Sequence, residues 1–97
     1  MKLIIAPEAE AELAEAAAWY EERRAGLGVQ LVADIDRAFE AILESPLVYP
    51  PWNAGPAHRR YVVRRFPYLV FYEVVDEGVI VRAVAHAKRR PGYWTDR

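Results

Sequence analysis

Two amphipathic helices joined by a three-residue link constrain this chain more than any other feature. Ala and Glu, both good helix formers, dominate residues 7–24, and Pro7 suits a first helical turn. An apolar stripe at helical spacing predicts a second helix over residues 28–44, which ends before Ser45-Pro46. Because the link Ala25-Gly26-Leu27 is so short, the two helices must be antiparallel neighbours. We therefore expect a helical hairpin.

The remaining periodic segments have the pattern of strands. Residues 69–75 alternate with a period of two, and Pro67, which cannot donate to a ladder, is expected in the connection before them. Further strands are predicted over residues 2–5, 60–65 and 79–87, with a turn at residues 76–78 and an irregular connection over residues 46–58. The chain is expected to form one α+β domain over residues 1–97, in the order β-α-α-β-β-β. The hairpin would cover one face of a small, mostly antiparallel sheet.

Alternation also predicts which side chains face the helices. On the middle strand we assign Val70, Tyr72 and Val74 to the helix side, and Leu69, Phe71 and Glu73 to the open side. On the last strand, the small Ala83 and Ala85 are assigned to the helix side because they would let the helices approach. Arg82 and His86 would then share the open face with Glu73, unless a β-bulge inverts the pattern.

The charges are divided unevenly along the chain. The net charge is −1, but residues 1–57 carry four basic and ten acidic side chains, whereas residues 58–97 carry nine basic and four acidic ones. This asymmetry predicts either a basic working face and an acidic back, or two halves that neutralise each other in the fold. The acids of the first helix, Glu12 among them, are expected on a solvated face.

Composition excludes several classes of site. The chain has no cysteine, which excludes disulfides and thiolate metal sites and suits a reducing compartment. Two histidines without paired carboxylates at ligand spacing predict no metal site, and no glycine-rich phosphate loop is present. The first apolar run is too short for a signal peptide or a membrane span. We expect a cytoplasmic protein without a cofactor and without a membrane partner.

The basic and aromatic carboxy-terminal end is the candidate functional segment. Arginine and tryptophan dominate interface hot spots because they combine contact area with directional hydrogen bonds, and they also pair with phosphates and stack on bases in RNA. We expect this end to stand outward as a docking surface. The alternative is that Tyr93 and Trp94 fold back onto the sheet and that Arg97 pairs with an acid of the same chain.

The order of these features resembles the ParE/RelE superfamily of type II toxin–antitoxin toxins. The resemblance covers nearly the whole chain and rests most strongly on Phe66-Pro67-Tyr68 and on the segment from His86 to Trp94, which reads His-x-x-Arg-x-Pro-Gly-Tyr-Trp. Trp19-Tyr20 and Gly26-Leu27-Gly28 also match. The chain looks closest to the ParE, or plasmid stabilisation, branch.

The resemblance implies a bacterial growth inhibitor that is neutralised by a cognate antitoxin, a small DNA-binding protein with a flexible C-terminal segment. It leaves two mechanisms open. ParE-type members poison DNA gyrase by protein–protein contact and need no catalytic residues. RelE-type members cleave messenger RNA on the ribosome, which requires charge stabilisation at the phosphate and an acid/base group near the 2′-hydroxyl.

The residues match the nuclease pattern only in part. RelE-type enzymes place an arginine after the tyrosine that opens the central strand, where this chain has Leu69. An apolar side chain cannot neutralise a scissile phosphate, and each lost contact of that kind costs roughly a hundredfold in rate or more. His86, Arg89 and Tyr93 could still form a different acid/base site. The other possibility is a structural His86 that donates to a backbone carbonyl.

We therefore expect a ParE-like gyrase inhibitor, with a RelE-type endoribonuclease as the alternative. The residues expected to bind the target are Arg89, Arg90, Tyr93, Trp94 and Arg97. The residues expected to bind the antitoxin are Arg64, Arg65, Leu69 and Phe71, because an open apolar and basic groove suits an amphipathic acidic peptide.

Overall fold

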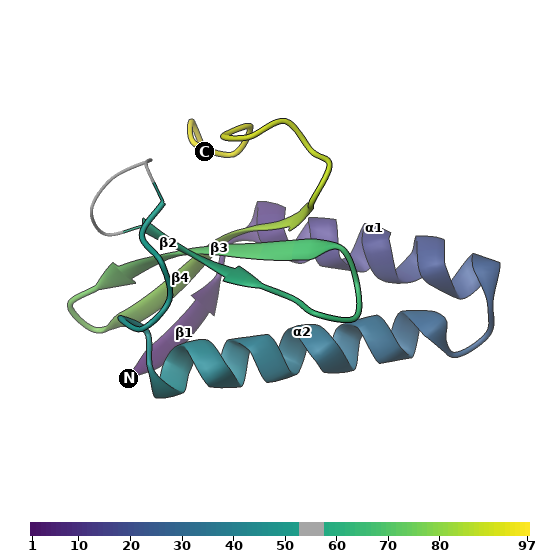
Figure 1. Ribbon diagram of the computed structural model, residues 1–97, viewed down its shortest axis with the longest axis horizontal. Helices are drawn as coiled ribbons and strands as arrows, with labels where there is room; N and C mark the ends of the chain where they lie inside the picture. The colour runs from purple at the N-terminus through teal and green to yellow at the C-terminus, as the bar shows by residue number, and fades with distance from the viewer. Residues whose placement is uncertain (53–57) are drawn as a thin grey trace.

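The computed structural model describes residues 1–52 and 58–97; residues 53–57 of the predicted connection lie outside this part of the chain. The elements follow in the order β1 (Lys2–Ile5), α1 (Pro7–Arg23), α2 (Leu27–Glu44), β2 (His58–Val62), β3 (Tyr68–Val75) and β4 (Gly78–His86). The strands form one sheet in the order β1-β4-β3-β2, in which only β1 pairs in parallel. The predicted α+β class, element order and mostly antiparallel sheet are confirmed, and Figure 1 shows the helical hairpin beside the sheet.

Glycine and one glutamate build the link between the helices. Gly26 has φ +88°, a left-handed conformation that favours glycine. A Cβ at Gly28 would stand 2.4 Å from the carbonyl oxygen of Ala17, so a side chain there would push the helices apart. Glu21 accepts hydrogen bonds from the backbone N–H of Gly26 and of Gly28, at 2.7 and 2.9 Å. The Gly26 bond, despite an opposing effect of burial, leaves the pKa of Glu21 below its ordinary value.

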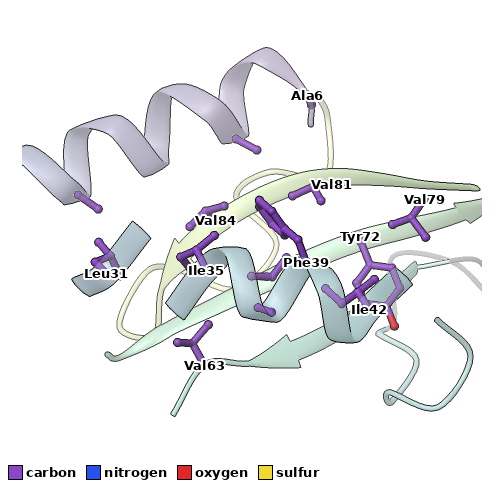
Figure 2. Packing of buried hydrophobic residues seen from close by; sticks show 14 of the residues in the cluster. Ala6, Leu31, Ile35, Phe39, Ile42, Val63, Tyr72, Val79, Val81 and Val84 are labelled. Atoms are coloured by element: carbon purple, nitrogen blue, oxygen red, sulfur yellow. The ribbon is translucent and has the colours of Figure 1, made fainter. Parts of the chain in front are cut away.

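The main core lies between α2 and the sheet. Leu31, Ile35, Phe39 and Ile42 of α2 pack against the strand residues Tyr72, Val79, Val81 and Val84, as Figure 2 shows. Val70 and Tyr72 are fully buried on this side and Val74 packs against the same cluster, as predicted. Tyr72 also donates a hydrogen bond of 2.6 Å to the carbonyl oxygen of Pro46, which holds the segment after α2 under the sheet.

A β-bulge corrects the predicted facing of the last strand. Phe71 pairs with Ala83, but the next residue, Tyr72, pairs with Val81, so Arg82 is an extra residue on β4. Val79 and Val81 therefore face the helices, whereas Ala83 and Ala85 lie in a second cluster on the other face. The prediction that these two alanines face the helices is wrong. Arg82 does meet Glu73, with 2.6 Å between Nη2 and Oε1.

The strand predicted over residues 60–65 is displaced toward the N-terminus. β2 ends at Val62, and Val63 closes the turn to β3 by donating to the carbonyl oxygen of Tyr68 at 3.0 Å. Phe66 turns inward and its ring packs edge-on against Tyr20 at 5.0 Å between centroids. Burial of Phe66 thus fixes the connection in which Arg64 and Arg65 lie.

Candidate functional site

The carboxy-terminal segment, residues 87–97, folds back across the sheet face that the helices leave open. Figure 1 shows it on the opposite side of the sheet from α2. The Trp94 side chain is buried, with 2% of its surface exposed, and forms the second cluster with Phe71, Ala83 and Ala85. Its ring lies 5.0 Å from that of Phe71. The prediction that Trp94 stands outward is wrong, because its apolar surface fills the space above the two alanines.

Glu12 of α1 holds the end of this segment. Its carboxylate accepts a hydrogen bond from the Tyr93 hydroxyl and two from Arg97, each 3.0 Å long. It also accepts the backbone N–H of Val84 at 3.1 Å. Burial, and then the hydrogen bond to Glu12, raise the pKa of Tyr93 well above its ordinary value. The prediction that Glu12 lies on a solvated face is wrong. The expectation that the Arg97 side chain is free to bind a target is also wrong, because Arg97 pairs with Glu12, as the alternative had it.

One accessible part of the segment is a basic ridge, which we define as Lys88, Arg89 and Arg90. All three residues are exposed. The Arg89 guanidinium lies 4.0 Å from the centre of the Tyr93 ring, close enough for a cation–π contact. Because Glu12 binds the hydroxyl of the same tyrosine, Arg89 rests on an anchored support. Two of the five predicted target-binding residues, Arg89 and Arg90, therefore present free charge.

His86 lies on the α1 side of the sheet, since the bulge reverses the predicted facing. Its ring packs edge-on against Tyr68 at 5.3 Å, and its Nδ1 accepts the backbone N–H of Lys88 at 3.1 Å. The structural role predicted for His86 was as a hydrogen-bond donor to a backbone carbonyl, whereas here its Nδ1 is an acceptor. His86, Arg89 and Tyr93 all border the small pocket under the segment. The Tyr93 hydroxyl, however, donates to Glu12, so it is not a free base.

A groove of about 320 Å³ runs between α1 and the end of β4. Its α1 wall carries Glu12, Glu15 and Trp19, and its opposite wall carries His86 and Arg89. Burial and the nearby Tyr20 and Glu12 raise the pKa of Tyr68, which also lines the groove. Sequence reasoning missed the α1 residues, because their mixed spacing does not reveal which of them reach the edge of β4.

The predicted antitoxin-binding residues do not form one surface. Phe71 is buried beneath Trp94, and Leu69 is half-buried in the same cluster. Arg64 and Arg65 instead line a different groove with Asp34 of α2. The predicted open apolar and basic groove is wrong, because the carboxy-terminal segment covers its apolar half.

Two further features bear on the kind of site. Among residues 1–52 and 58–97, no group of three or more His, Asp or Glu side chains is placed to hold a metal ion. Within the same described ranges, no helix has the length and hydropathy needed to cross a membrane.

One family model matches most of this chain, and one solved structure shares its fold. Residues 3–91 match the family model described as the ParE toxin of the type II toxin–antitoxin system, parDE. A solved structure entitled "Chromosomal ParDE TA system from P. aeruginosa" has the same fold, with a TM-score of 0.79 over 91% of this chain and 97% of that chain at 16% identity. A search of curated protein sequences found no match.

Proposed function

This chain belongs to the ParE toxin family of type II toxin–antitoxin systems, and we propose that it inhibits growth by binding and poisoning DNA gyrase in the cytoplasm. Its activity is neutralised by a cognate antitoxin, a small DNA-binding protein whose flexible C-terminal segment covers the toxin. The mechanism is one of protein–protein contact and requires no cofactor.

The observation that carries this proposal is the basic ridge of Lys88, Arg89 and Arg90. Exposed arginines lose much side-chain entropy when they bind, and a preorganised arginine loses less. Arg89 is stacked on Tyr93, and Tyr93 is bonded to Glu12, so Arg89 is preorganised. Trp94 and Arg97 support the segment from beneath, while Arg89 and Arg90 make the contacts with the target.

A second candidate function is a RelE-type, ribosome-dependent endoribonuclease. The observation in its favour is the groove beside α1, where Glu15 lies with His86 and Arg89, whereas Glu12 is already bonded to Tyr93 and Arg97. Such a groove offers groups for acid/base chemistry. Against it stands Leu69, which gives no charge at the position where these enzymes have an arginine.

The test is a supercoiling assay with purified gyrase, together with detection of the cleavage complex. The parent protein should inhibit supercoiling, and the double variant Arg89→Ala/Arg90→Ala should lose at least tenfold in potency. Lys2→Ala/Arg24→Ala is the matched control, since it removes the same charge from exposed positions elsewhere and should inhibit like the parent. Mapping messenger RNA ends after induction gives the opposing result: codon-positioned cuts that disappear in Arg89→Ala would overturn the gyrase proposal.

A further inference from the structure

The groove of about 320 Å³ beside α1 adjoins the basic ridge, because Arg89 belongs to both. It lies where α1 passes the end of β4 (Figure 1), and we call it the α1 groove. The proposed gyrase contact gives a role to the ridge but none to the groove. A surface that continues the ridge would face the same partner, so the lining of the groove indicates what that partner presents.

Three aromatic side chains give the α1 groove its apolar lining: Trp19, Tyr20 and Tyr68. Tyr20 packs edge-on against the other two, with its ring centroid 5.0 Å from that of Trp19 and 6.3 Å from that of Tyr68. The Arg23 guanidinium lies 3.7 Å from the centre of the Trp19 ring. These contacts orient Trp19, yet this residue is 51% exposed. An oriented and half-exposed tryptophan is a suitable contact for an aromatic side chain of a partner.

The polar groups of the α1 groove differ between its two walls. On the α1 wall Glu15 is exposed and makes no ion pair among the described residues, and a carboxylate only accepts hydrogen bonds. On the opposite wall Arg89 has only donors. His86 accepts the Lys88 N–H at Nδ1, so its neutral ring carries the proton on Nε2, which is a second donor. An acceptor on one wall thus accompanies donors on the other.

A tyrosine side chain matches both features of the groove. Its ring can pack on the three aromatic rings, and its hydroxyl can donate to Glu15 while it accepts from Arg89 or His86. Phenylalanine would leave these polar groups without a partner, and a cationic side chain would be repelled by Arg89. The three cations of the adjoining ridge favour acidic residues beside the tyrosine.

We propose that the α1 groove receives a tyrosine side chain from an acidic segment of the target, and that Trp19 and Glu15 determine this specificity. The identity of the target rests on the proposed function, whereas the chemistry of the bound side chain follows from the groove. Carboxylates beside the tyrosine pair with the basic ridge, so that groove and ridge recognise one segment.

The first test uses a labelled cyclic peptide of seven residues, one tyrosine among glutamates and glycines, and measures binding by fluorescence anisotropy. The parent protein should bind it, and phenylalanine in place of the tyrosine should weaken binding about tenfold, since polar groups then lose a partner. Glu15→Ala should lose most of this preference. Glu10→Ala removes the same charge from another exposed position of α1 and should keep it. Absent binding, equal binding of the two peptides by the parent protein, or an unchanged preference in Glu15→Ala would overturn the proposal.

The second test addresses the contact between rings. Trp19→Ala should weaken binding of the tyrosine peptide about tenfold, as for other aromatic hot spots. Val29→Ala, which shortens an exposed apolar side chain elsewhere, should bind like the parent protein. Equal affinity in Trp19→Ala would overturn the role of Trp19. A mononucleotide offers a flat ring of another class and should displace the labelled peptide poorly; displacement at lower concentration than the unlabelled tyrosine peptide would overturn the tyrosine assignment.

Gyrase inhibition separates this inference from the proposed function. Trp19→Ala and Glu15→Ala should each inhibit supercoiling less potently than the parent protein, whereas Val29→Ala and Glu10→Ala should inhibit like it. Full inhibition by both groove variants removes only this inference. Tyrosine-selective peptide binding by a parent protein that does not inhibit gyrase removes only the proposed target.

Discussion

Two carboxylates, the partly buried Glu12 of α1 and the buried Asp34 of α2, pair with arginines in this fold with different consequences. The side chain of Glu12 in α1 is 14% exposed, and the side chain of its partner Arg97 is 20% exposed. Asp34 of α2 is 8% exposed, but its partners Arg37 and Arg65 remain more than half exposed. Pairing with Glu12 therefore leaves the Arg97 side chain mostly covered, whereas pairing with Asp34 leaves two arginine side chains largely in solvent.

The difference arises from what each carboxylate must satisfy. β1 pairs with β4 only from Gly78 to Val81, and among the described strands none continues along the rest of that edge. There Glu12 accepts the Val84 N–H at 3.1 Å and Arg97 donates to the Arg82 carbonyl oxygen at 3.1 Å. The side chains of Glu12 and Arg97 thus make the hydrogen bonds to β4 that a neighbouring strand would make. Buried backbone N–H and C=O groups need such partners. Asp34 makes no comparable backbone bond among those found, so its arginines are free to act outward.

The largest expected effect is loss of stability when the anchor of the carboxy-terminal segment is removed. Trp94→Ala would leave a cavity above Ala83 and Ala85, and such changes cost about 3–5 kcal/mol. Urea denaturation followed by circular dichroism measures the effect. Trp19→Ala is the matched control, because Trp19 is 51% exposed and its loss should cost less than about 1 kcal/mol.

A smaller volume change keeps this prediction testable if the alanine variant does not fold. Trp94→Phe retains part of the packing and should unfold at a lower urea concentration than the parent protein. Equal stability of Trp94→Phe, Trp94→Ala and parent would mean that the segment is not anchored to the sheet.

The second prediction compares the two carboxylates directly by double-mutant cycles. The Glu12–Arg97 pair should show a coupling free energy of about 1.5–3 kcal/mol, as expected for hydrogen bonds to a charged group away from water. The Asp34–Arg65 pair should show less than about 1 kcal/mol, since the guanidinium is solvated. The four single and two double alanine variants give both values by urea denaturation. Equal couplings would erase the distinction between the two sites.

Local pattern was enough to predict the elements and the helix-facing side of β3. The hairpin followed from the short link, and Val70, Tyr72 and Val74 face the helices as alternation requires. The facing of β4 was not predictable, because the extra residue Arg82 reverses alternation and a bulge leaves no signal in an otherwise regular strand. The small side chains of Ala83 and Ala85 do allow another group to pack closely on the sheet. That group is Trp94, however, and not a helix as predicted.

The site was harder to predict because its contacts join distant parts of the chain. Glu12 binds Tyr93 and Arg97 across more than eighty residues, and only the fold brings them together. Arg64 and Arg65 were predicted to share a surface with Leu69, but burial of Phe66 turns their connection toward α2, where they line a groove with Asp34. Arg37 was missed because on the sequence it is one charge of a solvated helix face.

The third prediction concerns alkaline pH. Burial is the main cause that raises the pKa of Tyr72 to about 12. A raised pKa in the folded state means that the neutral hydroxyl stabilises the fold fully below the unfolded value of about 10, and that this stability is lost as pH rises toward 12. Stability should therefore fall above about pH 10. Tyr72→Phe should be less stable at pH 7 by about 1 kcal/mol, from the lost bond to Pro46, but should lose less on going to pH 11. Parallel pH profiles would contradict this assignment.

The smallest expected effect is at the arginines that surround Asp34. Arg37→Ala leaves Asp34 paired with Arg65, so the buried carboxylate is not stranded and the cost should be below about 1 kcal/mol. Arg64→Ala should change stability by less than about 0.5 kcal/mol, as for other exposed positions. Arg97→Ala is the informative comparison, since it also removes the donor to the Arg82 carbonyl and should cost more than either. If Arg37→Ala were as destabilising as Arg97→Ala, Asp34 would be a second structural anchor. The contrast between the two carboxylates would then be wrong, because the exposed arginines would be required by the fold as much as Arg97 is.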